Sequence, residues 1–200
     1  MQKLILLTAS YIIGSIPFGF LIAYWVKRFD IRKFGSGNIG ATNVFRVVGR
    51  PWGILVFILD FFKGFIPPLS VKALIPDSPS YIFIFAAFLA VCGHNWTCFL
   101  KFKGGKGVAT SVGAVCALSL IFPRLWLILG LTILLWIIIF LLFRYVSLAS
   151  IFAAFSFFAL CLFLSHSAEI NIVAFVFFVF ILLRHKKNIK KLFDRTEHRF

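Results

Sequence analysis

Residues 4–26 read LILLTASYIIGSIPFGFLIAYWV, a stretch of 23 residues without a single charge. About 20 apolar residues in a helix are enough to cross the hydrocarbon core of a bilayer. The stretch is long for a signal peptide and lacks a small-x-small cleavage site, so we expect a retained membrane helix. Six more apolar segments follow, at residues 51–71, 81–100, 108–122, 125–143, 145–165 and 170–183. The sequence thus predicts an all-α integral membrane protein with seven transmembrane helices.

The composition agrees with a membrane protein. The chain has 200 residues, of which 62% are hydrophobic and 14% are charged. A soluble domain of this size could not bury so much apolar surface, which excludes an ordinary cytosolic enzyme, a disordered chain and a secreted disulfide scaffold. Seven spans of about 20 residues leave only connecting segments. We therefore expect one domain over residues 1–200 and no separate soluble domain.

The charges predict an orientation. There are 21 Lys and Arg residues against 6 acidic residues, a net charge of +15. In a membrane protein Lys and Arg gather in cytoplasmic loops, so we expect no nucleic-acid partner. Residues 27–50, 101–107, 144 and 184–200 hold 17 of these cations, and the connections on the opposite side hold three. Seven crossings place the 17 on one side, which predicts an outside amino terminus and a cytoplasmic carboxyl terminus.

The first inner segment reads FGSGNIGATNVFR at residues 34–46. Its GxGxxG pattern lacks the preceding strand of a dinucleotide-binding fold. Glycines still let the backbone approach a ligand, and free amides at a helix start attract anions. The segment also carries short polar donors and one arginine fork that suits phosphate. We expect an anion-binding loop formed by Gly35, Gly37 and Gly40 with Ser36, Asn38, Thr42 and Arg46. The alternative is a glycine hinge with helix-capping residues.

The second inner segment contains GGKG at residues 104–107, directly before an apolar helix. It lacks the spacing of an ATPase phosphate loop. Gly104 and Gly105 could nevertheless present amides to a phosphate, and Lys106 an ammonium. The alternative is an ordinary basic loop, which the charge rule alone would produce.

The carboxyl-terminal segment reads RHKKNIKKLFDRTE at residues 184–197. If the last helix continues into the cytoplasm, His185 and Asn188 share one face. His185 could then bind phosphate as a cation or transfer a proton. The alternative is a basic stop at a helix C-terminus, where positive charge is stabilising. His166 and His198 are expected at the surface.

Asp60 and Lys63 lie inside the second apolar segment. Charges in a membrane span are expensive and often functional, and an i, i+3 pair can neutralise itself. They either support a site or form a polar lock between helices. Acidic residues are otherwise scarce, and no Ser-His-Asp set or metal-ligand cluster occurs, so we expect no covalent nucleophile, no metal and no cofactor.

The three segments together resemble the bacterial acyl-phosphate-dependent glycerol-3-phosphate acyltransferase family, the PlsY type. The resemblance rests on GSGNIGATNVFR, on GHNW followed by KFKGGKGVAT, and on RHKKNIKKLF followed by TE, and DFFKG at residues 60–64 resembles a further family segment. It covers essentially the whole chain. It implies a seven-helix protein of the bacterial cytoplasmic membrane with its active site at the cytoplasmic face.

The resemblance implies acyl transfer from a fatty acyl phosphate to the sn-1 hydroxyl of glycerol 3-phosphate, the first step of phospholipid synthesis. The products would be lysophosphatidate and inorganic phosphate. The partners would be the bilayer and these two small molecules, and the chain could act as a monomer. Because the donor is already activated, we expect direct attack by the hydroxyl, helped by positioning and charge stabilisation.

The family motifs carry over onto Ser36, Asn38, Arg46, Gly104, Gly105, Lys106, His185, Asn188 and Glu197. We expect catalytic roles for Ser36, Arg46, Lys106, His185 and Asn188. We expect phosphate contacts from Gly35, Gly37, Asn38, Gly40, Thr42, Gly104 and Gly105, and support from Asp60, Lys63 and Glu197. Two positions depart from the family: Lys191 stands where Arg is common, and Arg195 where Gly is common.

A transporter or flippase for a phosphorylated solute or lipid is the competing class. It predicts discontinuous helices at mid-membrane and inverted repeats. A non-catalytic membrane protein would explain the basic loops but not three polar clusters on one side.

Overall fold

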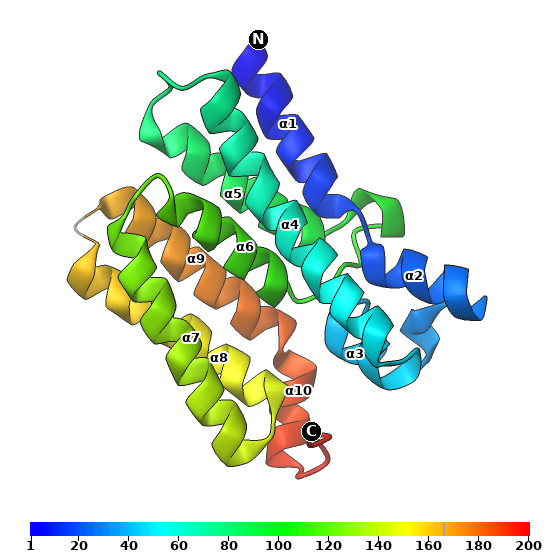
Figure 1. The fold of residues 1–200 in the computed structure, drawn as a ribbon. Helices are drawn as coiled ribbons and strands as arrows, with labels where there is room; N and C mark the ends of the chain where they lie inside the picture. The colour runs from blue at the N-terminus through cyan, green and yellow to red at the C-terminus, as the bar shows by residue number, and fades with distance from the viewer. Residues whose placement is uncertain (166) are drawn as a thin grey trace. The chain divides into compact units, whose positions relative to one another are not determined.

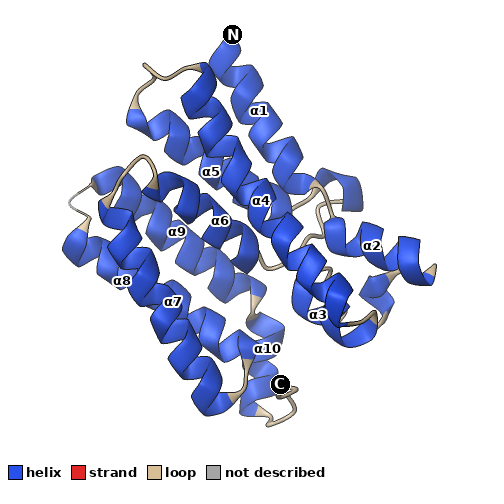
Figure 2. Cartoon of the chain, in the orientation of Figure 1, coloured by secondary structure: helices blue, strands red, loops and turns tan. Residues whose placement is uncertain are grey.

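The computed structural model describes residues 1–165 and 167–200, and this part of the chain contains helices and no strand. Figure 1 shows the course of the chain, and Figure 2 shows the helices and their connections. His166, expected at the surface, lies outside the described residues. The chain forms two compact units, Met1–Leu118 and Ser119–Phe200. The expectation of one membrane domain over residues 1–200 stays a prediction.

The helices of the first unit are α1 (Gln2–Ser15), α2 (Phe18–Lys27), η1 (Ile31–Lys33), α3 (Ala41–Val47), α4 (Arg50–Leu74), α5 (Ser80–Asn95), η2 (Cys98–Leu100) and α6 (Val108–Ser119). The helices of the second unit are α7 (Arg124–Phe143), α8 (Val146–Leu164), α9 (Ala168–Arg184) and α10 (Lys186–Phe193). The expected boundary at Arg144 is confirmed, because this residue ends α7 in a left-handed conformation, with φ 59°.

All seven apolar segments are helical, which confirms the all-α class. In the described chain five spans are long and apolar enough to cross a membrane: Gln2–Lys27, Arg50–Leu74, Ser80–Leu100, Arg124–Phe143 and Val146–Leu164. The pair α9 and α10 would form a sixth span, and α6 is a shorter apolar helix. The count of seven crossings and the orientation of the termini stay predictions.

Two expected helices are not continuous. The segment expected at residues 4–26 is confirmed as one candidate span, Gln2–Lys27, but its helix is interrupted between α1 and α2 at Ile16 and Pro17. Proline has no amide to donate and its ring clashes with the preceding turn, which explains the break. The last helix also does not run straight into the tail, because α9 and α10 meet at an angle of 58°. His185 ends the first of them and begins the second.

In the first unit α1, α4 and α5 pack side by side (Figure 1). Glycines allow α1 and α5 to approach closely. A Cβ on Gly14 would lie 2.1 Å from the Ala90 carbonyl oxygen, and one on Gly93 would lie 2.3 Å from the Tyr11 carbonyl oxygen. Small residues at such crossings are typical of helices packed in membranes, where close van der Waals contact drives association.

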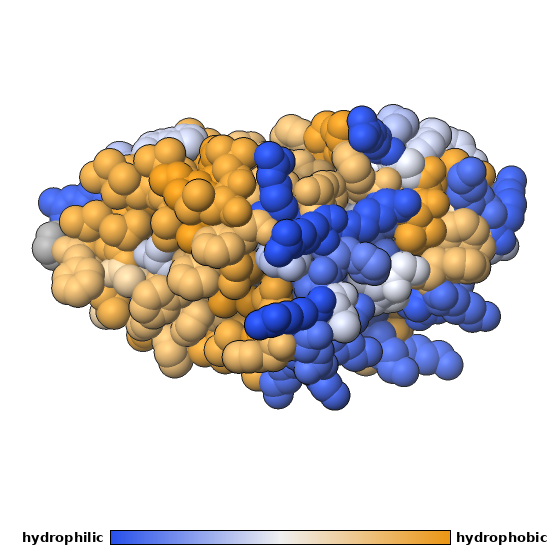
Figure 3. All heavy atoms as spheres, turned by 90° about the horizontal axis from the view of Figure 1, so that it is seen from below, coloured by the Kyte–Doolittle hydropathy of each residue, from blue (hydrophilic) through white to orange (hydrophobic). Residues whose placement is uncertain are grey.

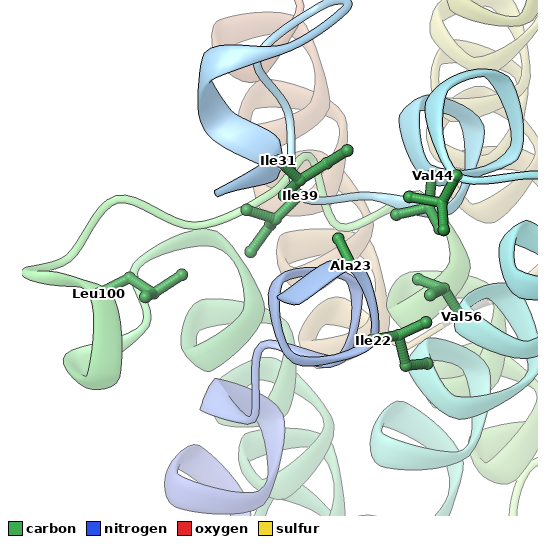
Figure 4. Packing of buried hydrophobic residues seen from close by; sticks show 8 residues of the cluster. Ile22, Ala23, Ile31, Ile39, Val44, Val56 and Leu100 are labelled. Carbon is green, nitrogen blue, oxygen red and sulfur yellow. The ribbon is translucent and has the colours of Figure 1, made fainter. Parts of the chain in front are cut away.

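One apolar cluster includes residues of the segments that follow α2 and α5. Figure 4 shows Ile22 and Ala23 of α2 among residues from η1, α3, α4 and η2. Its remaining labelled members are Ile31, Ile39, Val44, Val56 and Leu100. Because Ile39 lies in the first inner segment and Leu100 precedes the second, one cluster supports both.

Large apolar side chains are exposed on the membrane-spanning helices. On α7 they include Leu127, Leu131, Leu134, Ile138 and Leu142. Figure 3, a view from below, shows broad hydrophobic surfaces beside a concentration of hydrophilic residues. Exposed apolar surface of this extent indicates contact with lipid rather than with water.

Candidate functional site

The first polar loop, residues 34–40, is organised by one side chain. Asn43 of α3 is buried, and its Oδ1 accepts a hydrogen bond from the Ser36 amide at 2.9 Å. Its Nδ2 donates to the carbonyl oxygens of Asn38 at 2.8 Å and Phe34 at 3.1 Å. Both ends of the loop are therefore tied to the helix that follows it.

Glycine is required at Gly35 for two reasons. Its φ of 59° lies in the left-handed region, which side chains disfavour. A Cβ there would also lie 2.3 Å from Asn43 Oδ1. Any other residue at this position would push the loop away from Asn43.

Several loop amides are already occupied, unlike the free amides expected from the sequence. Ser36 donates to Asn43, Gly37 donates to the Phe34 carbonyl at 3.0 Å, and Gly40 donates to Asn38 Oδ1 at 3.0 Å. Side chains are the more accessible groups here. Ser36 and Arg46 are exposed, whereas Asn38 and Thr42 are half-buried.

The acidic residue nearest to this loop in the sequence is paired. Asp30 accepts hydrogen bonds from Arg32 Nε at 2.9 Å and Nη2 at 2.7 Å, and from the Arg32 amide at 3.0 Å. The Arg32 guanidinium holds the pKa of this carboxyl below its usual value of 3.8. The negative charge next to the loop is thus balanced, and an anionic ligand meets less repulsion.

The second loop, residues 101–107, closes onto the end of α5. Gly104 and Gly105 donate their amides to the carbonyl oxygens of Asn95 at 3.2 Å and His94 at 3.0 Å. Like those of the first loop, these amides are engaged inside the protein. A Cβ on Gly104 would lie 2.0 Å from the His94 carbonyl oxygen, so glycine allows the contact. Lys106 follows this anchored turn and is half-buried.

Asp60 and Lys63 form the expected ion pair, with 2.7 Å between Asp60 Oδ1 and Lys63 Nζ. Both are buried, at 2% and 3% exposed. His94 of α5 joins them, with its Nδ1 3.7 Å from Asp60 Oδ1. The sequence predicted the pair from its i, i+3 spacing but not this histidine, which lies more than 30 residues further along the chain.

In the second unit the tail residues Asn188 and Glu197 meet. Asn188 Nδ2 donates to Glu197 Oε1 at 2.7 Å, and Ser147 Oγ of α8 donates to the same oxygen at 3.1 Å. The carboxylate therefore holds α10 against the start of α8. No local pattern in the sequence predicts the role of Ser147, because this residue lies 50 residues from its partner.

His185 lies at the bend between α9 and α10 and is buried. Its Nδ1 lies 2.7 Å from the Ile181 carbonyl oxygen. A carbonyl only accepts, so this bond assigns the proton to Nδ1. In the neutral ring Nε2 then carries the lone pair and can accept a proton or a hydrogen bond.

Of the two departures from the family pattern, Lys191 lies in the last turn of α10 and Arg195 in the turn that follows this helix. The Lys191 carbonyl accepts hydrogen bonds from the amides of Thr196 and Glu197, at 2.8 Å and 3.1 Å. Arg195 has a φ of 55°, in the left-handed region. Glycine adopts this conformation without strain, which explains why it suits the position.

Comparison with known proteins is consistent with the sequence motifs. The family model described as glycerol-3-phosphate acyltransferase matches residues 4–195. A glycerol-3-phosphate acyltransferase of Aquifex aeolicus (strain VF5) is 45% identical over 201 residues, covering 100% of both chains. One of Staphylococcus aureus (strain Newman) is 41% identical over 206 residues, covering 98% of this chain and 97% of the relative.

Two solved structures have the same fold. Both are crystal structures of PlsY (YgiH), an integral membrane glycerol 3-phosphate acyltransferase. The glycerol 3-phosphate form has a TM-score of 0.89 and 42% identity, and the lysophosphatidic acid form has 0.85 and 41%. Each comparison covers 100% of this chain and 96% of the other. The break between α1 and α2 is one feature that a transporter would predict, but these relatives are acyltransferases.

Proposed function

Because the chain belongs to the glycerol-3-phosphate acyltransferase family, we propose that it transfers a fatty acyl group from an acyl phosphate to the sn-1 hydroxyl of glycerol 3-phosphate. An ester bond forms between the hydroxyl oxygen and the acyl carbon. The bond between that carbon and the phosphate oxygen breaks. The products are lysophosphatidate and inorganic phosphate, which leaves with the electron pair of the broken bond.

The mixed anhydride is already activated, so the hydroxyl attacks it directly without an acyl-enzyme. Such a reaction gains most from holding the two substrates together and from stabilising the negative charge of the transition state. Arg46 and Lys106 neutralise phosphate charge, and Ser36, Asn38 and Asn188 donate neutral hydrogen bonds. His185 Nε2 orients phosphate or accepts the hydroxyl proton.

The glycines have a different role from the one their sequence suggested. Since the amides of Gly37, Gly40, Gly104 and Gly105 donate inside the protein, these residues shape the loops. Thr42 adds a donor at the start of α3. Asp60 and Lys63 support the loops without contacting the substrates, and Glu197 supports the tail. The phosphate groups are then contacted by side chains of these loops rather than by the glycine amides.

The Asn43 network is the observation that carries the proposal. It fixes the loop before α3 by three hydrogen bonds at 3.1 Å or less and leaves Ser36 and Arg46 exposed. A pre-organised loop with an exposed cation and hydroxyl suits a small water-soluble phosphate ester. The acyl chain stays in lipid, where each buried CH₂ contributes about 0.8 kcal/mol.

The distribution of cations supports a location at the cytoplasmic face of a bacterial inner membrane. Residues 27–50, the second loop and the tail are the segments rich in Lys and Arg. Positive loops face the cytoplasm. Glycerol 3-phosphate and a membrane-bound acyl phosphate would then meet at that surface.

The proposal is tested with purified protein in lipid nanodiscs supplied with palmitoyl phosphate and glycerol 3-phosphate. We expect inorganic phosphate and 1-acyl-glycerol 3-phosphate in equal amounts, and loss of both in Lys106→Ala. Lys101→Ala, an exposed lysine of the same loop, is the matched control and should keep its turnover.

Palmitoyl-CoA serves as a parallel donor. Equal or faster turnover with the thioester would reject the acyl-phosphate assignment. Product acylated at the sn-2 position would reject the proposed regiochemistry. A folded protein that releases no product but carries glycerol 3-phosphate across vesicles would favour the transporter.

A further inference from the structure

A buried charge cluster lies in the first unit. It consists of Asp60 and Lys63 on α4 and His94 on α5, which are each between 2% and 4% exposed. Taking charges out of water and lipid headgroups is costly, so a buried pair is weak evidence for stability alone. What the cluster touches suggests another role.

Lys63 reaches the break in the first span. Its Nζ donates to the Ile16 carbonyl oxygen at 2.8 Å, just before Pro17. The same carbonyl accepts the Phe18 amide at 3.1 Å, and the buried ammonium supplies a second donor at the helix break, where carbonyls lose their usual helical partners. Lys63 thereby fixes the point at which α2 begins.

From that point α2 leads to the first loop. A Cβ on Gly19 would lie 1.8 Å from the Ile39 carbonyl oxygen. The backbones of α2 and the loop are thus in direct contact one turn after the break. Ile39 lies between Asn38 and Gly40, in the loop that holds Ser36. A shift of α2 would therefore be passed directly to this loop.

His94 reaches the second loop from the other side of the cluster. Its Nδ1 lies 3.7 Å from Asp60 Oδ1, and a Cβ added to Gly105 would lie 2.1 Å from its Nε2. Its carbonyl also accepts the Gly105 amide at 3.0 Å. Because Gly105 precedes Lys106, the orientation of the His94 ring sets the turn that places this lysine.

We propose that Asp60, Lys63 and His94 are positioning residues that hold the two loops in register with each other. One arm runs from Lys63 through Ile16 and α2 to Ile39, and the other runs from Asp60 through His94 to Gly105. The ion pair joins the arms inside α4. In its effect on catalysis the inference rests on the proposed function, because Ser36 and Lys106 must act on the same substrates.

The primary test compares Lys63→Met with Lys72→Met in nanodiscs. Lys72 lies on the same helix, is exposed, and donates to the Pro76 carbonyl at 3.2 Å, so it is a matched control. We expect Lys63→Met to raise the KM for glycerol 3-phosphate about tenfold or more, which is the effect of misplacing one charge-assisted contact. The value of kcat should fall less, and Lys63→Arg should recover most of the loss.

Hydrogen exchange followed by mass spectrometry supplies the structural readout. In Lys63→Met, peptides covering residues 34–45 and 101–107 should both exchange faster, whereas peptides from α7 and α8 should be unchanged. If the ion pair only stabilised α4, its loss would speed exchange in α4 but not in both loops. A folded Lys63→Met protein with both loops and KM unchanged would overturn the proposal.

His94→Leu tests the arm through Gly105 independently of the arm through Ile16. It also provides the test of the proposal if Lys63→Met does not fold. It should loosen residues 101–107 and leave residues 34–40 as in the unmodified chain. Unchanged exchange at residues 101–107 would overturn the proposal. Exchange requires no substrate, so these measurements remain decisive even if the enzyme refuses acyl phosphate, which would reject only the proposed function.

Discussion

The side-chain oxygen of Asn43 accepts a hydrogen bond from the Ser36 amide across seven residues of sequence, at 2.9 Å. Together with the bonds that Asn43 Nδ2 donates to the carbonyls of Phe34 and Asn38, this bond ties the first polar loop to α3. Ser36 and Arg46 stand on either side of Asn43 in the chain, so the position of each depends on the same buried amide. Pre-organisation of this kind lowers the cost of ordering a loop when a ligand binds.

Replacing Asn43 should therefore weaken the binding of glycerol 3-phosphate, although Asn43 itself is buried. Asn43→Ala leaves the Ser36 amide and the carbonyls of Phe34 and Asn38 without their partner. Each such group costs about 1–3 kcal/mol when it is shielded from water. We expect kcat/KM for glycerol 3-phosphate to fall at least about tenfold, measured by phosphate release. Asn43→Asp keeps the acceptor but loses both donors, and a near-normal rate in that variant would contradict the role of Nδ2.

Arg46 and Arg50 offer a matched comparison. Both are exposed, and only Arg46 belongs to the motif. A charge-assisted hydrogen bond contributes about 1.5–3 kcal/mol, so Arg46→Ala should reduce kcat/KM between about tenfold and a hundredfold. Arg46→Lys should recover part of this, because a lysine keeps the charge but not the planar fork. The kcat/KM of Arg50→Ala should stay within about twofold of the parent value, because most substitutions of exposed residues have small effects. Equal losses at both positions would mean that general surface charge, not a specific contact, matters.

Glu197 should act through Asn188. Glu197→Ala removes the acceptor that Asn188 and Ser147 share, so we expect the tail to loosen and kcat/KM to fall by about tenfold or more. Glu197→Gln retains an oxygen acceptor without the charge, so its kcat/KM should lie between that of the parent protein and that of Glu197→Ala. Asp194→Ala, at an exposed acid of the same tail, is the control. Steady-state kinetics and hydrogen exchange of residues 185–197 measure both effects, and an Asn188→Ala, Glu197→Ala double variant with additive losses would show that the residues act independently.

Arg195 should be a site of strain. A left-handed conformation costs a residue other than glycine about 1–2 kcal/mol, and Arg195 has a φ of 55°. Arg195→Gly should therefore raise the free energy of unfolding by about 1 kcal/mol, or Tm by roughly 2–4 °C. Lys187→Gly, inside α10 with ordinary helical geometry, should lower stability by a similar amount. Thermal unfolding in detergent measures both, and a destabilising Arg195→Gly would show that its side chain makes a contact worth more than the strain.

The sequence alone determined the helical class, the apolar segments and the three polar segments. Uncharged runs such as residues 4–26 can satisfy their backbone in lipid only as helices. The boundary at Arg144 and the pairing of Asp60 with Lys63 followed from hydropathy and from the i, i+3 spacing. These features depend on neighbours in the chain, which is why local physical rules predict them.

The tertiary structure decided which groups in those segments are used. The amides of Ser36, Gly105 and their neighbours looked available in the sequence, yet they donate to Asn43, to His94 and to other groups of the protein. The break at Pro17, the bend at His185 and the partner of Glu197 also emerged only in the fold. Each depends on atoms that lie far apart in the sequence, and hydrogen bonding and close packing between such atoms have no local periodicity to reveal them.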